Sequence, residues 1–267
     1  MAFSCYDPLY SQCWREVEES GILQMELVEH VFSKFKSQRV EKEDILDMME
    51  QFGLIAKYTS TATSTKYFVP AQLKTTPKSI CKLEPSPSDP CPLYLHFAGG
   101  FVPHGLFTQL VSRFISWCCK TWKTELPSLY RNGAWFVVGK QVVCDFILLC
   151  KKSFIKIVLK QRKQDSIVSK AELAEIARRV CMFIEEVLQM LSNELPCLSG
   201  LQHQLCVACP HCLTDCPNHQ QALCPHEDCL HLFALKKGQR IICTKVPGGC
   251  VKTVPGMEKW LSLRNQV

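Results

Sequence analysis

The chain has 267 residues, of which 47% are hydrophobic and 21% charged, with a formal net charge of +6 and 18 cysteines. This composition excludes wholesale disorder, and the length suits one or two domains with a sizeable core. Residues 1–14 lack the basic and apolar regions of a secretory signal, and no window of about 18 apolar residues predicts a membrane span. We therefore expect a cytoplasmic protein whose cysteines fill the core, bind metal or remain reactive thiols.

The charge is unevenly distributed along the chain. Residues 1–80 carry 9 basic and 11 acidic side chains, a net charge of −2, whereas residues 81–267 carry 22 and 14, a net charge of +8. A modest basic excess permits an acidic partner but does not require one.

Residues 1–75 predict a small helical subdomain with a β-hairpin. Apolar residues at helical spacing predict helices over residues 25–35 and 41–52. The inner stripe of the second helix is expected to consist of Ile45, Leu46, Met48, Met49 and Phe52. Strands are expected at residues 54–58 and 66–69, with a polar loop between them. Two helices followed by two strands is the element order of a winged helix, so a winged-helix subdomain is expected here.

The second of these helices would enter the DNA major groove in a winged helix that binds DNA, but it is acidic. The only basic residue of this helix is Lys42. Gly53 follows the last residue of the helix, where a C-terminal cap is expected. The acidic side chains are Glu41, Glu43, Asp44, Asp47 and Glu50. Contacts to phosphates dominate DNA affinity, and this face would repel them. DNA binding by the helix is therefore disfavoured.

Residues 76–92 contain five prolines and are expected to form a linker or a surface loop at a domain boundary. Residues 93–200 are expected to form an α/β subdomain with a mainly antiparallel sheet. Its strands are expected at residues 93–97, 134–138, 142–150 and 154–160, and its helices at residues 107–118 and 169–191. The strand at residues 154–160 alternates apolar residues with lysines and is predicted to be half-buried.

Residues 201–267 form a tail rich in cysteine and histidine, which are the usual ligands of zinc. Overlapping C-x-x-C spacings leave the ligand set open. We prefer Cys209 and Cys212, because Pro210 and His211 between them can form a tight turn, with Cys224 and Cys229 as the second pair. The alternative ligands are Cys206, Cys216, His219 and Cys243. A structural zinc that stabilises a short tail is expected, and the alternative is a reduced cysteine-rich surface without an ion.

No catalytic motif is recognisable in the sequence. The signatures of a zinc deaminase and of H-E-x-x-H metalloproteases are absent, as are phosphate-binding G-x-x-x-x-G-K-[ST], G-x-G-x-x-G and G-x-S-x-G. We therefore expect a protein that is not an enzyme. The long helix at residues 169–191 is expected to pack on the sheet, with partner binding as the alternative.

Three stretches taken in order resemble the COR region of Roco proteins, the segment that follows their Ras-like GTPase module. Residues 42–73, which include Phe52-Gly53-Leu54 and Tyr67-Phe68-Val69-Pro70, are similar to the winged-helix half of that region. Residues 101–107 with Asn132-Gly133-Ala134 are similar to the start of its second half, and Cys209, Cys212 and Cys243 resemble the tail of some animal members. The resemblance covers roughly residues 14–250.

The resemblance implies a non-catalytic module that relays nucleotide state and supports dimerisation, mainly through its second half. The chain has no GTPase module, leucine-rich repeats or kinase, so a Ras-like GTPase domain would have to act in trans or from another part of a longer protein. Phe101, Phe107 and Trp135 are candidates for contacts with protein partners, although core burial explains them equally well. The alternative function is a zinc-dependent nucleic-acid-binding protein that uses the winged helix and the basic C-terminal part.

Overall fold

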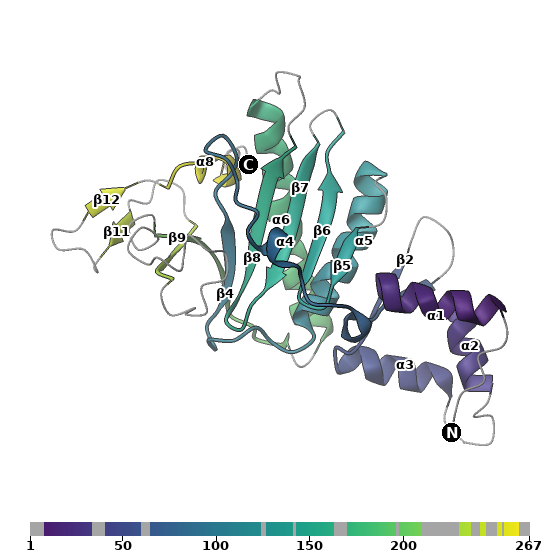
Figure 1. Cartoon of the computed structure of the whole chain (residues 1–267). Helices are drawn as coiled ribbons and strands as arrows, with labels where there is room; N and C mark the ends of the chain where they lie inside the picture. The colour runs from purple at the N-terminus through teal and green to yellow at the C-terminus, as the bar shows by residue number, and fades with distance from the viewer. Residues whose placement is uncertain are drawn as a thin grey trace. The chain divides into compact units, whose positions relative to one another are not determined.

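The structure is a computed structural model, and it has a mixed α+β fold (Figure 1). The described residues are 8–33, 41–59, 65–123, 127–140, 143–162, 170–195, 198–209, 230–235, 241–243, 250–252 and 254–261. They form two compact units: the first combines residues 1–75 and 103–134, and the second combines residues 76–102 and 135–267.

The sequence analysis expected consecutive domains at residues 1–75, 76–92, 93–200 and 201–267. In the structure, the leading segment of the first unit ends at Thr75. Residues 103–134, however, group with the first unit, and the proline-rich residues 76–92 are built into the second. Local sequence patterns predict elements but not which elements pack together, and this explains the difference.

The first unit begins with α1 and contains a small antiparallel sheet. Its elements are α1 (Pro8–Ser20), β1 (Ile22–Gln24), α2 (Met25–Ser33), α3 (Lys42–Gln51), β2 (Ala56–Thr59), β3 (Thr65–Phe68), the 3₁₀ helix η1 (Pro70–Gln72) and α5 (Leu106–Trp122). The strand order is β1-β3-β2, with β1 and β2 both antiparallel to β3. The predicted helices over residues 25–35 and 41–52 correspond to α2 and α3, and the hairpin to β2 and β3. The three-residue strand β1 was not predicted, because so short a run shows no measurable alternation.

The core of the first unit is made by one face of α2 and α3 packed on the sheet. Its buried members are Val28, Leu46, Ile55 and Tyr67, and Leu23, Met25, Phe32, Met49 and Val69 pack around them. Because Leu46 and Met49 lie three residues apart on α3, they project from the same side of that helix. The other side of α3 is therefore left outside this core.

Gly53 ends α3 and lies against Gly105, the residue before α5. Gly53 has φ +67°, its N–H donates to Glu50 O at 2.9 Å, and the N–H of Leu54 donates to Met49 O at 2.9 Å. These two bonds form a Schellman motif, which confirms the expected C-terminal cap. A Cβ on Gly53 would lie 2.2 Å from the Cα of Gly105, so two backbones approach here as only glycines permit.

The second unit is built on a large sheet. The sheet has the strand order β10-β9-β4-β8-β7-β6-β5, and the pairings β10–β9, β9–β4, β4–β8 and β8–β7 are antiparallel. By residue range, β5 and the first two residues of β6 are counted with the first unit, and the other strands belong to the second. Its strands are β4 (Leu93–Phe97), β5 (Ser128–Tyr130), β6 (Gly133–Val138), β7 (Cys144–Cys150), β8 (Phe154–Gln161), β9 (His203–Ala208) and β10 (Leu232–Ala234). A separate two-stranded sheet pairs β11 (Ile241–Cys243) with β12 (Cys250–Lys252). The expected mainly antiparallel sheet is therefore present.

The central strands β7 and β8 are buried on both faces. In Figure 1, α6 (Lys170–Glu194) lies behind β7 and β8, and the short helix α4 (Lys78–Cys81) lies in front of them. Residues 144–149 are all buried, as the apolar run in this strand predicted. The prediction that β8 is only half-buried is wrong, because Phe154 and Val158 are buried as well. Lys156, on the same face, donates to Glu84 Oε1 at 2.8 Å, so the proline-rich segment covers the face that was expected to meet solvent.

Asp89 fastens the proline-rich segment to β8. This carboxylate is 3% exposed, accepts hydrogen bonds from the N–H and the hydroxyl of Ser86, and accepts a third from the N–H of Gln161 at 3.1 Å. Farther along the chain, α8 (Glu258–Leu261) contacts the same segment, where Trp260 Nε1 donates to Cys91 O at 2.8 Å. The expected linker is thus an integral part of the second unit.

Candidate functional site

The two ends of the cysteine- and histidine-rich segment meet at the edge of the large sheet. Strands β9 and β10 are antiparallel, with Ala208 opposite Leu232. One residue beyond them, the N–H of Cys209 donates to the carbonyl of His231 at 2.7 Å. Cys209 is fully buried, and the His231 ring contacts the Phe233 ring with 4.4 Å between centroids. The chain therefore leaves the sheet at Cys209 and returns to it at His231.

Most of the predicted zinc ligands lie outside the described residues. These are Cys212, Cys216, His219, Cys224 and Cys229. Of the remaining two alternatives, Cys243 lies in β11 directly opposite Cys250 of β12, and Cys206 lies in β9. Within the described ranges, no group of three or more histidine, cysteine, aspartate or glutamate side chains is arranged to hold a metal ion.

Cys206 behaves as a core residue. It is 3% exposed and packs with Tyr94, Phe154 and Ala208, and its Sγ lies 3.7 Å from Gln204 O. Burial raises the pKa of the Cys206 thiol to about 11. Cys206 therefore fills part of the apolar core on this face of the sheet.

The three residues predicted to contact partners have different environments. Phe101 is 59% exposed, whereas Phe107 is buried in α5 at 6%. Trp135, on β6, is partly buried, and its Nε1 donates to Asp145 Oδ1 at 2.8 Å. Of the three, only Phe101 presents a largely exposed apolar side chain to solvent.

Asp145 organises a polar cluster on the sheet that sequence reasoning missed. Its Oδ1 also accepts a hydrogen bond from Arg162 Nε at 2.6 Å, and the Arg162 guanidinium lies 5.9 Å from the centroid of the Trp135 ring. Asp145 is 8% exposed, and a buried carboxylate needs such partners. The signal was one acidic residue inside the apolar run of residues 142–150. The cluster joins β6 and β7 to the residue that follows β8, and it has the form of a structural anchor.

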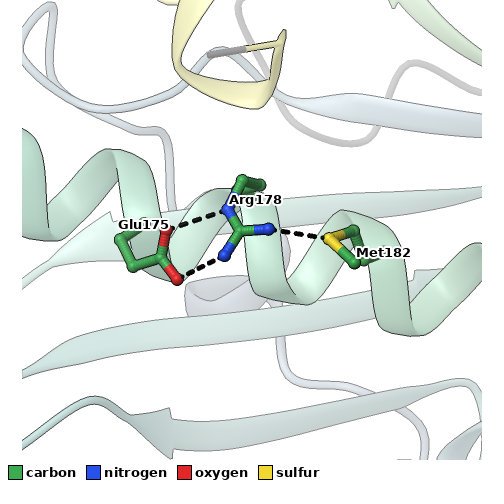
Figure 2. Close-up of polar contacts among 3 residues, drawn as sticks. All are labelled: Glu175, Arg178 and Met182. Atoms are coloured by element: carbon green, nitrogen blue, oxygen red, sulfur yellow. Dashed lines mark hydrogen bonds and ion pairs between the residues drawn. The ribbon is translucent and has the colours of Figure 1, made fainter. Parts of the chain in front are cut away.

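Two helices present exposed side chains of mixed character. On α6, Arg178 makes two hydrogen bonds to the Glu175 carboxylate, at 2.8 and 2.6 Å, and its Nη1 lies 2.9 Å from Met182 Sδ (Figure 2). On α3, Lys42 forms ion pairs with Glu29 at 3.4 Å and with Glu43 at 3.6 Å. The one basic residue of α3 is therefore engaged, and the outer face of the helix keeps a negative charge.

The cysteine thiols of the described residues are buried in several places. Burial raises the pKa of Cys91 and of Cys144 to about 12, and it also raises the pKa of Cys118. None of the ten cysteines whose side chains are described forms a disulfide bond. The thiols of Cys91, Cys118 and Cys144 are therefore protonated and unreactive at neutral pH.

No protein-family model matches the chain, and no curated protein matches it. Along the described ranges, none of the helices has the length and apolar character that a membrane span requires. The geometry of the described residues is therefore the basis for the functional argument.

Proposed function

We propose that the chain is a non-catalytic module for protein interaction and dimerisation, similar to the COR region of Roco proteins, and that it couples to a Ras-like GTPase domain in trans. The observation that carries the proposal is the first unit. Its order α1-β1-α2-α3-β2-β3, with the strand order β1-β3-β2, supports a winged helix in which β2 and β3 form the wing. This is the half of the region that residues 42–73 resemble.

The charge of α3 supports protein rather than DNA as the partner of this winged helix. Residues 41–54 carry five acidic side chains and one lysine, and that lysine is paired. A recognition helix must approach phosphates closely, and this one would repel them. The alternative, zinc-dependent nucleic-acid binding, has in its favour the net charge of +8 on residues 81–267. Retention of DNA or RNA that falls steeply with added salt would favour that alternative.

We propose a structural zinc in the tail, held by Cys209, Cys212, Cys224 and Cys229. The hydrogen bond between Cys209 and His231 supports this set, because it places the first ligand close to the chain segment that follows Cys229. Cys206, Cys216, His219 and Cys243 stay open as alternative ligands. The ion would close a long segment that has little apolar content to hold it together.

Elemental analysis tests the zinc. Protein purified under reducing conditions without chelator is expected to contain about one zinc per chain. The double variant Cys212→Ser/Cys224→Ser is expected to contain none, whereas Cys119→Ser, a partly exposed cysteine on α5, is expected to keep the ion. Protein that contains no zinc rules out the metal.

Affinity capture with the full chain tests the interaction function. Cell extract is divided and supplied with a non-hydrolysable GTP analogue or with GDP, and captured proteins are identified by mass spectrometry. We expect a Ras-like GTPase whose recovery differs between the two nucleotides, and light scattering is expected to show a dimer at high concentration. Equal recovery with both nucleotides, or no GTPase at all, contradicts the coupling. A cytoplasmic location is part of the proposal, and reduced cysteines support it.

A further inference from the structure

The outer face of α3 carries an apolar cluster at its C-terminal end. Met48 is 49% exposed and Phe52 is 63% exposed, and they lie four residues apart on one face of the helix. The Schellman turn brings the chain back after Gly53, and Leu54, at 46% exposure, follows it. Single exposed apolar residues are ordinary on protein surfaces, but three within seven residues form a patch.

The same face is acidic at its N-terminal end. Asp44 and Asp47 are exposed, and within the part of the chain that the structure describes neither forms an ion pair. The helix dipole stabilises an acidic residue in the first turn, which accounts for Asp44 but not for Asp47. Aspartate is also a poor helix former, so Asp47 is not there to stabilise the helix.

The charge on α3 acts on its neighbours. The pKa of Tyr67, in the core beneath the helix, is raised first by burial and then by the negative charges of Glu50, Asp47 and Glu43. Glu50 Oε1 accepts a hydrogen bond from the N–H of Lys57 at 2.8 Å, and this bond joins the helix to β2. The field at this face is therefore negative, and a cation that approached it would be attracted.

We propose that this α3 stripe, made of Asp44, Asp47, Met48, Phe52 and Leu54, docks a basic amphipathic helix of a partner protein. Residues 44 and 52 are separated by about 12 Å along the axis, at 1.5 Å per residue. The matching partner carries lysine or arginine at one end of a two-turn face and bulky apolar side chains at the other. This inference rests on the proposed interaction function and deepens it by naming the surface and the chemistry of the partner.

Other occupants fit the stripe less well. Nucleic acid and anionic lipid would bring phosphates to Asp44 and Asp47, and like charges repel. An uncharged apolar helix would cover Phe52 but leave the two carboxylates beside apolar surface, which costs desolvation free energy. A basic amphipathic helix satisfies both ends of the stripe at once.

Fluorescence anisotropy with the full chain tests the proposal. The probe is an 18-residue fluorescein-labelled peptide with leucine on one helical face and lysine on the other. We expect saturable binding that Phe52→Ser or Met48→Ser weakens about 10-fold, because burying the apolar anchors supplies most of the binding free energy. The double variant Asp44→Lys/Asp47→Lys is expected to weaken binding by at least as much and to remove most of its salt dependence.

Matched controls come from α1 in the same unit. Trp14 is 40% exposed and Glu18 and Glu19 are exposed, so Trp14→Ser and Glu18→Lys/Glu19→Lys make the same kinds of change elsewhere. They are expected to leave the affinity within about twofold. Equal weakening by the α1 and α3 variants would mean general charge attraction and would overturn the proposal. Circular dichroism of each variant establishes that the fold is kept, as expected for exposed positions.

The remaining outcomes distinguish failure of the docking proposal for the α3 stripe from failure of the proposed GTPase coupling. If sedimentation shows a dimer that Phe52→Ser abolishes, the occupant is a second copy of this chain, and the proposal as stated is wrong. A peptide in which glutamate replaces lysine is expected not to bind, and binding of it at equal strength contradicts the charge argument. Peptide binding at α3 without nucleotide-dependent GTPase capture would keep the docking surface and refute the GTPase coupling.

Discussion

Three ion pairs of the second unit contrast with the stripe on α3 of the first unit. In the second unit, Asp145 pairs with Arg162, Lys156 with Glu84, and Glu175 with Arg178. On α3 of the first unit, two carboxylates and a phenylalanine face solvent instead. A helix whose charged side chains pair with each other is suited to support the fold. A helix that exposes unpaired carboxylates beside apolar side chains is suited to bind a partner protein. The docking surface proposed above therefore lies on α3 of the first unit.

The largest effect is expected at the contact between Gly53 and Gly105. In Gly105→Ala the new Cβ would lie 2.6 Å from the Cα of Gly53, at a backbone φ of +78°. Left-handed strain and the backbone clash together are expected to lower the free energy of unfolding by roughly 2–4 kcal/mol. Chemical denaturation measures it.

Gly100 provides the matched control for this substitution. Its φ is +72°, but nothing lies within 4 Å of the position of a Cβ. Gly100→Ala therefore carries the strain without the clash and is expected to cost only about 1 kcal/mol. Equal losses in the two variants would show that the close approach contributes nothing.

A smaller loss is expected when the proline-rich segment is released from the second unit. Asp89→Ala removes the acceptor for the N–H groups of Ser86 and Gln161, which lowers the free energy of unfolding by about 2 kcal/mol. Limited proteolysis is expected to cut within residues 76–92, and peptide binding at α3 is expected to be unchanged. Ser88→Ala, at an exposed position in the same turn, is expected to cost less than about 0.5 kcal/mol. Protection of residues 76–92 from proteolysis in both variants would contradict the role of Asp89 in holding this segment.

The buried thiols of the second unit are expected to make its stability fall at high pH. The pKa of Cys144 is raised by burial to about 12, above the value near 9 in an unfolded chain. Between these values the unfolded state has lost the proton and the folded state has kept it, so stability is full below pH 9 and declines above it. Cys144→Ala is expected to remove about 1 kcal/mol of this decline between pH 9 and 10.

Urea titrations at pH 7, 9 and 10 under reducing conditions measure that difference. Cys119→Ser is the comparison, because this thiol is only partly buried and its pKa is raised less than that of its neighbour Cys118. An unchanged slope in Cys144→Ala would mean that the thiol titrates normally and is open to solvent.

The smallest effect is expected on the surface of α6. Glu175→Gln removes the paired hydrogen bonds to Arg178, which lower the pKa of Glu175, and is expected to cost about 0.3–0.5 kcal/mol. A lowered carboxyl pKa stabilises the fold above the unfolded pKa, so the difference from the parent protein is expected to vanish as the pH falls below about 4. Thermal unfolding at pH 7 and pH 3.5 measures this. A loss above 1 kcal/mol would mean that the α6 surface is more than solvated exterior.

The sequence alone predicted about half of the elements that the structure describes, and it missed α1, β5, β9 and the short elements near the C-terminus. Residues 93–97 became β4 at both limits, α3 and α6 began and ended close to the expected residues, and Gly53 caps α3 as expected. These features depend on spacing within about ten residues, where the burial of one face imposes a period that the sequence must carry. The acidity of α3, and with it the case against DNA, was readable in the same way.

Only the tertiary structure decided which elements share a unit and which side chains stay exposed to solvent. It placed residues 103–134 with the first unit, covered the lysine face of β8, brought Gly105 to Gly53, and gave Asp145 two partners outside its own strand. Contacts between residues far apart in the chain leave no periodic trace, because any apolar face can bury against any other. For the same reason the prediction for Met48 and Phe52 is wrong: helical spacing placed both on the inner stripe of α3, but they are 49% and 63% exposed, because the core of the first unit takes only the side of the helix that carries Leu46 and Met49.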